Sequence, residues 1–446
     1  DGWREAIAHT SRWPGQSILY AVVTSFFCVG SPPLRDILMR TPSLLGSLVA
    51  LFLLYRFAER IAGEGAGVVA TAVFITHPSM IRIAVGARPY ALAIAACIAS
   101  FYCFYEWLQT GSRRYWMLYL AASVAVIYLH YLFAFIFFVQ FLYLLLDGSV
   151  RRTASWGKVA ISAAVLAAST LPLWPALVLL VKNAHTLPFA GRPSPDQFIT
   201  ALIPLTSIFA ATLAWLYIEL RSQPGFPRDE RRDRSGLILI IVWWLVGPLF
   251  FYGASTLSRM TVFVERYIAF AIPATCLLIA WGAVRIFPAK QLRQWLWIMA
   301  AILVLNPPML ARFFRPGAEE YGPAIRIINS LADRERVPVF VRSPLIESNY
   351  QNWKAGATKD SYLFAPIAAY PITGEMIPLP NILDDDARTY IQTTVAGKLA
   401  GADRILMLGH WDDVMLPWIL EYLKERGYEV REWNPNSIAA LEFRKH

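Results

Sequence analysis

Residues 77–90 read HPSMIRIAVGARPY, a polar stretch that separates two apolar runs at residues 67–75 and 91–104. Apolar runs of this kind predict membrane helices, so the stretch is expected to be the short turn between two of them. Arginine, histidine and tyrosine side chains are costly at the edge of a bilayer unless they bind something. Pro89 favours a helix start, because the missing N–H of proline is harmless in a first turn. The pattern therefore predicts that Arg88 and Tyr90 lie at the mouth of a helical bundle, on one side of the membrane.

The composition of the chain is that of a polytopic membrane protein. Of its 446 residues, 57% are hydrophobic and 16% are charged, and the mean hydropathy is +0.44, far from the averages of soluble domains. Residues 312–446 hold 16 basic and 18 acidic side chains, net −2, so the +10 of the whole chain leaves +12 for residues 1–311. The basic excess belongs to the membrane part and indicates topology. No nucleic-acid partner is expected.

Hydropathy predicts about ten membrane spans within residues 1–311. Residues 16–30 are apolar but fall short of the roughly twenty residues that a span needs, so we expect an interfacial helix there. Because the chain opens in a polar segment, we also expect a first membrane helix upstream of Asp1. The runs 116–130 and 131–146 meet at His130 and are either a bent pair of spans or one broken helix. The predicted spans are residues 42–59, 65–81, 88–108, 116–130, 131–146, 158–181, 198–220, 236–254, 267–286 and 294–311.

The connections between these spans alternate in character. One set is rich in arginine and lysine and includes Arg113-Arg114, Arg151-Arg152 and the linker 221–235. Positive loops stay on the cytoplasmic side of a membrane. The opposite set is therefore predicted to lie outside; it comprises residues 77–90, 130–131, 182–198 and 255–267.

Composition shifts at residue 312 to that of a soluble domain. Strand-like segments at 337–342, 404–408, 428–431 and 437–443 alternate with helix-like segments at 319–334 and 411–426. This alternation predicts a small α/β domain at residues 312–446, following the membrane domain at residues 1–311. Ten spans after an external N-terminus place the domain outside the membrane as well.

Four motifs resemble one known superfamily. They are RTPSLL at 40–45, ARPYAL at 87–92, HY at 130–131 and ERY at 265–267, the last followed by an apolar span that contains Pro273. Together they resemble the GT-C superfamily of integral-membrane glycosyltransferases, and most closely the bacterial branch similar to protein O-mannosyltransferases, glycosyltransferase family 39. The resemblance covers about residues 1–290. It implies a multi-pass protein of the bacterial inner membrane, with the C-terminal domain in the periplasm or outside.

The resemblance also implies the reaction. A sugar is transferred, with inversion, from a polyprenyl-phosphate-linked donor to a protein, lipid or glycan acceptor at the extracytoplasmic face. The lipid phosphate gains negative charge as it leaves, so it requires cationic donors at the level of the headgroups. Arg88 and Arg266 are the first candidates for binding the phosphate, and Arg259, Arg82 and Lys182 are further candidates. The plainer interpretation of such arginines is that they reach toward lipid headgroups.

Sugar and acceptor binding is expected from uncharged polar groups in the same loops. The candidates are His77, Tyr90, His130 and Tyr267. Single histidines near apolar helices are more often hydrogen-bonded core residues, and interfacial tyrosines are common without any further role. Each of the four therefore has both a functional and a structural interpretation.

The acceptor hydroxyl needs a carboxylate to take its proton. Members of the superfamily place this acid directly after the first membrane helix, and Asp1 is the nearest match to that position. Glu5 would lie one helical turn further along the same face, and Asp36 is a third candidate. Gly86 departs from the family pattern, because relatives often carry Gln or Glu there.

No metal site is predicted. The acidic run Asp384-Asp385-Asp386 is more simply a helix N-terminus, and the spacing of His410, Asp412 and Asp413 matches no metal motif. The resemblance leaves a divalent cation open, since some GT-C enzymes use one and others do not.

Two other functions compete with glycosyl transfer. A transporter or flippase of lipid-linked sugars would show internal repeats or paired broken spans, and neither is evident in the sequence. A non-catalytic membrane scaffold is the other alternative, and the weak acidic motif favours it.

Overall fold

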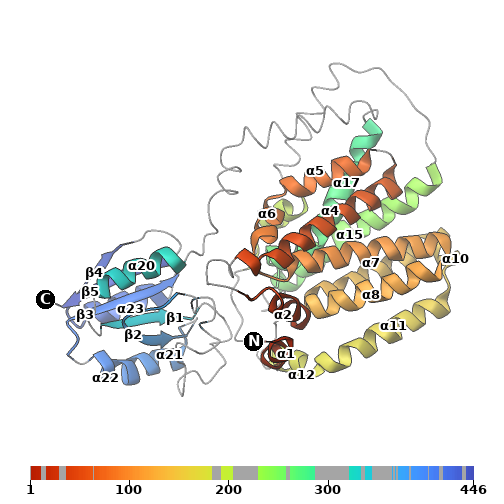
Figure 1. The fold of residues 1–446 in the computed structure, drawn as a ribbon. Coiled ribbons are helices and arrows are strands. Elements are labelled where there is room, and N and C mark those ends of the chain that lie inside the picture. Colours follow the sequence, from red (N-terminus) through yellow and green to blue (C-terminus); the bar gives the residue numbers. More distant parts are fainter. Residues whose placement is uncertain are drawn as a thin grey trace. The chain divides into compact units, whose positions relative to one another are not determined.

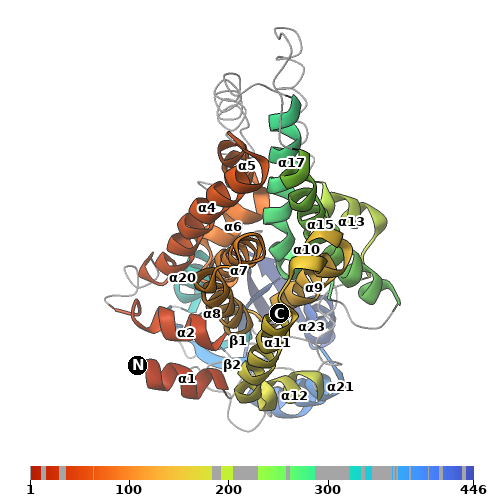
Figure 2. The same cartoon turned by 90° about the vertical axis from the view of Figure 1, so that its right-hand side faces the viewer.

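The computed structural model describes residues 2–11, 17–29, 37–63, 65–182, 192–203, 230–257, 262–286, 321–332, 337–343, 364, 367, 370–380, 383–399, 401–410, 415–433 and 438–445. The chain divides into two compact units, Asp1–Ala311 and Arg312–His446. The first unit is helical and the second contains a β-sheet (Figures 1 and 2).

The helices of the first unit begin with two short ones, α1 and α2, and continue with a bundle of longer ones (Figure 1). Their bounds are α1 Trp3–Ser11, α2 Ile18–Ser25, α4 Thr41–Ala62, α5 Ala66–Thr76, α6 Pro78–Val85, α7 Tyr90–Thr110, α8 Arg113–Leu129, η1 Tyr131–Phe135, α9 Ile136–Leu146, α10 Gly148–Thr153, α11 Trp156–Thr170, η2 Leu171–Leu173, α12 Trp174–Lys182, α13 Pro195–Leu202, α15 Glu230–Leu257, α16 Glu265–Ile268, η4 Ala269–Ala271 and α17 Ile272–Ile286.

Five helices among the described residues are long and apolar enough to cross a membrane, and a sixth span results if the bent pair α5–α6 is counted as one. The five comprise α4, α7, Trp156–Val178, Arg234–Leu257 and Glu265–Arg285. The protein is therefore a multi-pass membrane protein, as predicted. The predicted span 294–311 and most of the predicted span 198–220 lie outside the described residues.

The stretch at residues 77–90 differs from the simple turn predicted for it. The predicted span 65–81 is broken at His77, and α6 leaves the break at 72° to α5. The residue before a proline avoids the helical conformation, and His77 is extended, with φ −70° and ψ 123°. Pro78 then occupies the first turn of α6, while the Nδ1 atom of His77 accepts a hydrogen bond from the Ser79 N–H at 3.2 Å. His77 and Pro78 thus end one helix and start the next.

The runs 116–130 and 131–146 form two helices, α8 and α9, and neither is among the five described helices that could each cross a membrane. α8 ends at His130, whose backbone is extended, and the chain re-enters the bundle through η1 and α9. The hydroxyl of Tyr119 on α8 donates to Gln140 Oε1 on α9 at 3.1 Å. Gln140 Nε2 in turn donates to Ser100 Oγ on α7 at 3.0 Å. These bonds satisfy buried polar groups and hold α7, α8 and α9 together.

α4 and α7 approach each other closely at Gly46. A Cβ atom added at Gly46 would lie 2.9 Å from the backbone N of Leu92, so only glycine permits this approach. α4 therefore contacts the start of α7 directly. Further along α7, the indole of Trp243 stacks on Phe101 with centroids 3.8 Å apart and donates to the Phe270 carbonyl at 2.8 Å. The helices that carry the polar loops are fixed by this packed core.

The second unit is a small α/β domain with a mixed five-stranded sheet in the order β2-β1-β3-β5-β4. β1 is parallel to β2 and β3, whereas β5 is antiparallel to β3 and β4. The elements are α20 Tyr321–Ala332, β1 Pro338–Arg342, β2 Glu375–Leu379, α21 Asp385–Tyr390, η8 Ile391–Val395, α22 Ala396–Leu399, β3 Arg404–His410, α23 Met415–Lys424, β4 Tyr428–Glu432 and β5 Ile438–Lys445 (Figure 1). The predicted fold class, a polytopic helical membrane bundle followed by a small α/β domain, is confirmed. β2 was not predicted.

Candidate functional site

Tyr90 is the residue at which the predicted site comes together. It begins α7 directly after Pro89. Its phenol oxygen accepts a hydrogen bond from the Arg88 side chain and lies within electrostatic range of Arg266 and Tyr267. Arg88 and Arg266 are 178 positions apart in sequence, yet both act on one hydroxyl. The two arginines therefore lie at the same end of the bundle.

His130 lies beside Tyr90 and adds a second aromatic contact. Its ring centroid is 5.2 Å from that of Tyr90, 5.7 Å from that of Tyr267 and 4.4 Å from that of Phe133. Its Nδ1 atom is buried, and no described group lies within hydrogen-bonding distance of it. A polar atom in this position is available to a ligand hydroxyl or phosphate oxygen.

Arg266 and Tyr267 are presented by the four-residue helix α16. The chain reaches α16 through residues 262–264, which the hydroxyl of Ser255 orders by accepting the N–H groups of Val262 at 2.9 Å and Phe263 at 2.7 Å. The Arg266 guanidinium carbon lies 5.2 Å from the Tyr267 ring centroid, a cation–π distance.

The backbone of Arg88 is held from α4. Ser43 Oγ donates to the Arg88 carbonyl at 3.0 Å, and the Tyr20 hydroxyl lies 3.3 Å from Ser43 Oγ. The α2 helix that carries Tyr20 also contacts α8, because Ser17 Oγ donates to the Tyr128 carbonyl at 3.0 Å. The side chain of Arg88 is exposed, so its charge is accessible to a ligand while its backbone is fixed.

Glu265 joins the site through an ion pair that the sequence did not reveal. Its carboxylate accepts hydrogen bonds from the Ser79 hydroxyl and from the Arg82 guanidinium, both on α6. Arg82 and Glu265 are each about half exposed. Glu265 is part of the motif ERY at 265–267, but no sequence pattern near it indicates that it pairs with Arg82.

The remaining candidates are spread over other parts of the chain. His77 is buried and its Nδ1 atom caps α6, which leaves only Nε2 for a substrate. Glu5 is exposed on α1, and α1 packs against α2. Asp1 and Arg259 lie outside the described residues, and Lys182 ends α12 with a side chain that is also outside them.

Among the described residues, no group of three or more histidine, cysteine, aspartate or glutamate side chains is arranged to hold a metal ion. Asp384 is the N-cap of α21, and its carboxylate accepts the Ala387 N–H at 2.7 Å. The acidic run at 384–386 is thus a helix N-terminus, as predicted. Asp412 and Asp413 lie outside the described residues.

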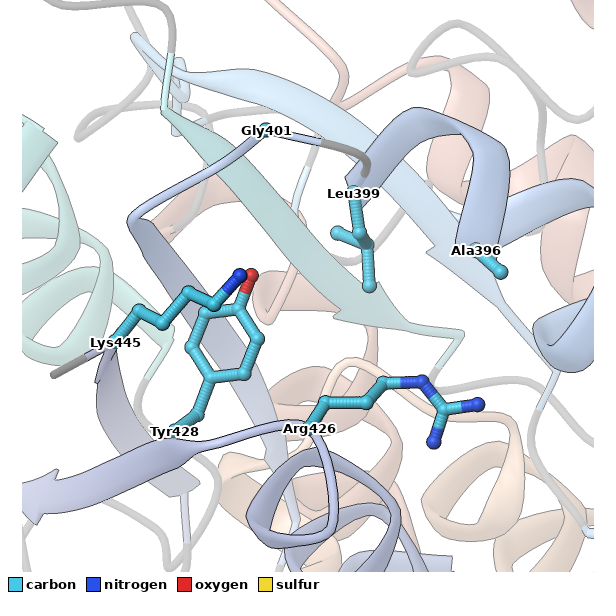
Figure 3. Close-up of a pocket in the computed structure, with 6 residues that line it drawn as sticks. All are labelled: Ala396, Leu399, Gly401, Arg426, Tyr428 and Lys445. Atoms are coloured by element: carbon cyan, nitrogen blue, oxygen red, sulfur yellow. The ribbon is translucent and has the colours of Figure 1, made fainter.

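The second unit contains a hollow of about 230 Å³ between α22, β4 and β5 (Figure 3). Its cations are Arg426 and Lys445, and Leu399 forms an apolar wall. Arg426 donates to the Tyr422 carbonyl at 2.9 Å and stacks on the Tyr422 ring at 3.6 Å, so it closes the end of α23. Tyr428 donates to the Ala402 carbonyl at 2.5 Å. Burial, and after it Asp403, raise the pKa of Tyr428. These polar groups thus stabilise the domain, and the candidate site remains the arginine pair of the first unit.

The fold is that of a class, the multi-pass membrane proteins with a GT-C fold. The family model described as dolichyl-phosphate-mannose-protein mannosyltransferase matches residues 11–175. No match was found among curated protein sequences.

Two solved structures share the fold over nearly the whole chain. The first is the structure of ArnT from Cupriavidus metallidurans bound to undecaprenyl phosphate, which is 14% identical in sequence, with a TM-score of 0.55. The match covers 99% of this chain and 92% of the ArnT chain. The second is the structure of the same protein in the apo state, which is 12% identical, with a TM-score of 0.56. This match covers 96% of the present chain and 88% of the ArnT chain. The predicted resemblance to the GT-C superfamily is confirmed at the level of the fold.

Proposed function

We propose that the protein is an integral-membrane glycosyltransferase that takes a sugar from a polyprenyl-phosphate donor. The observation that carries the proposal is that Arg88 and Arg266 lie at one cluster of rings, in which His130 contacts both Tyr90 and Tyr267. Two guanidinium groups at one end of a membrane bundle match the charge of a lipid phosphate. ArnT, which shares the fold, was solved with undecaprenyl phosphate bound, and this supports the same class of lipid here.

The arrangement matches the needs of an inverting displacement. The acceptor hydroxyl oxygen attacks the anomeric carbon, and the bond from that carbon to the phosphate oxygen breaks. Negative charge grows on the departing phosphate, where Arg88 and Arg266 stabilise it. Tyr90, Tyr267 and the Nδ1 atom of His130 lie beside the arginines and are placed to contact the sugar.

The proton of the acceptor hydroxyl goes to a carboxylate. Asp1 and Glu5 remain the proposed residues for this step. Glu5 lies on α1, which packs against α2, and Tyr20 of α2 lies 3.3 Å from Ser43, the residue that donates to the Arg88 carbonyl. Glu265 is a poorer base, since Ser79 and Arg82 already bind its carboxylate. We place the reaction at the extracytoplasmic face of the bacterial inner membrane, with residues 312–446 on that side.

The test is an assay of purified protein with a polyprenyl-phospho-sugar, in which released polyprenyl phosphate is measured. Arg88→Ala and Arg266→Ala are each expected to reduce release by about a hundredfold or more, the usual effect of removing one transition-state donor. Arg113→Ala, at the start of α8, is the matched control and should retain full release. Movement of the sugar lipid across liposomes without release would instead identify a transporter.

A further inference from the structure

The ion pair between Arg82 and Glu265 connects the two segments that carry the arginines. Arg82 is on α6, and α6 leads through Gly86 to Arg88, whose N–H donates to the Gly86 carbonyl at 2.8 Å. Glu265 directly precedes Arg266. The distance between the two phosphate-binding candidates therefore depends on how α6 is attached to α16.

The ion pair joins a short helix, α6, to the first turn of another helical run. α6 has eight residues and diverges by 72° from α5. α16 has four residues, of which Ile268 alone is buried. α16 is the first turn of the longer helical run Glu265–Arg285, and Glu265 lies exposed at the end of that run. The carboxylate of Glu265 accepts hydrogen bonds from Ser79 and Arg82, one helical turn apart on α6, and so holds one face of α6 against α16.

An exposed ion pair contributes little to overall stability. Its effect on geometry can be larger, because two cations bind one phosphate well only at the correct separation. The Arg88 backbone is already held from α4 by Ser43. The ion pair holds the segment that carries Arg266 against α6, the helix that precedes Arg88.

We propose that Arg82 and Glu265 are positioning residues that set the separation of Arg88 and Arg266 and thereby the affinity for a lipid phosphate. The inference rests on the proposed function, because it assumes that both arginines bind the donor phosphate. Neither Arg82 nor Glu265 is required to touch the reacting atoms.

The experiment measures binding of undecaprenyl phosphate to the full-length protein in detergent, together with kcat at saturating donor. Arg82→Gln and Glu265→Gln are each expected to raise Kd by about tenfold, as is usual for coupled sites, with kcat within about twofold. The double variant Arg82→Glu/Glu265→Arg, which reverses the pair, is expected to bring Kd back to within about threefold of the wild type. Melting temperatures of all variants verify that each is folded.

The matched control is the ion pair between Arg60 and Glu106, which joins α4 and α7 at the opposite end of the bundle. Glu106→Gln should lower the melting temperature and leave Kd unchanged. If the wild type binds no undecaprenyl phosphate, the proposed function is wrong. If it binds and the single variants bind equally well, the positioning role is wrong and the function stands. If the double variant binds undecaprenyl phosphate as weakly as the single variants, the positioning role is also wrong.

Discussion

At the scale of single residues, the Tyr90 hydroxyl accepts a hydrogen bond from Arg88 and lies within electrostatic range of Arg266. Tyr90 begins α7, its ring contacts His130 at 5.2 Å between centroids, and its oxygen accepts the Arg88 hydrogen bond. The phenol therefore orders Arg88 before any ligand arrives. Preorganised cations bind a phosphate more tightly because less side-chain freedom is lost on binding.

Tyr90→Phe tests this ordering role. The variant keeps the ring contact with His130 but loses the hydrogen bond to Arg88. A hydrogen bond to a charged group contributes about 1.5 kcal/mol or more, so Kd for undecaprenyl phosphate should rise by about tenfold. Tyr119→Phe removes a hydroxyl that is bonded to Gln140 away from the site and should leave Kd unchanged. An equal rise in Kd in both variants would contradict a specific role of Tyr90.

The sequence predicted which residues belong to the candidate site better than it predicted which residues they bond to. The site residues stand out because charged and polar side chains at the edge of a bilayer are costly unless they bind something; they are Arg88, Tyr90, His130, Arg266 and Tyr267. The pairing of Arg82 with Glu265 and the capping by His77 depend on which helices are neighbours. Neighbour relations between membrane helices are set by packing over the whole bundle, so they leave no local sign in a single sequence.

At the scale of elements, hydropathy predicted the long helices and missed the irregular ones. The bend at His77 had a local signal in Pro78, but the surrounding apolar run concealed it. β2 was missed because it contains Pro378, and a proline argues against a strand unless the strand is at an edge. β2 is an edge strand of the sheet, which accounts for the exception.

The contact between α4 and α7 gives a prediction at this scale. Gly46→Val should force the helices apart, because even a Cβ atom would lie 2.9 Å from the Leu92 backbone. Overpacking of this kind costs about 1–3 kcal/mol. Ser43, which binds the Arg88 carbonyl, lies one turn before Gly46, so donor binding should weaken together with the melting temperature. Gly253→Val, where nothing lies within 4 Å of an added Cβ, is the control; equal effects of both variants would contradict the role of the close approach.

At the scale of the whole molecule, each unit has its own core. The membrane unit is built around residues such as Phe101 and Trp243, whereas the second unit encloses its sheet with residues such as Phe340 and Ile405. Two separate cores predict that each unit unfolds as its own cooperative transition. A change in the stability of one unit should therefore leave the unfolding transition of the other unit unchanged.

Glu442 allows this independence to be tested by pH. Its side chain is fully buried on β5 and pairs with Arg404 at 2.5 Å and Arg444 at 2.9 Å. Burial alone would raise the pKa of Glu442, but the hydrogen bonds from the two arginines outweigh burial, so its pKa in the folded domain lies below the usual value. A lowered folded pKa stabilises the domain fully above the unfolded value of about 4.3. This stabilisation is lost as the pH falls through the lower folded value.

Hydrogen exchange of the full-length protein, followed on peptides from β3 and β5, measures this effect. Protection of these strands should fall between about pH 5 and pH 3, while peptides from α7 keep theirs. Glu442→Gln should reduce the protection of β3 and β5 already at neutral pH, since breaking a buried ion pair costs about 3–5 kcal/mol, and should weaken its dependence on pH. Glu421→Gln, at an exposed position of α23, should behave as the wild type. Loss of protection in α7 together with the sheet would show instead that the two units unfold as one, because a single cooperative transition exposes both cores.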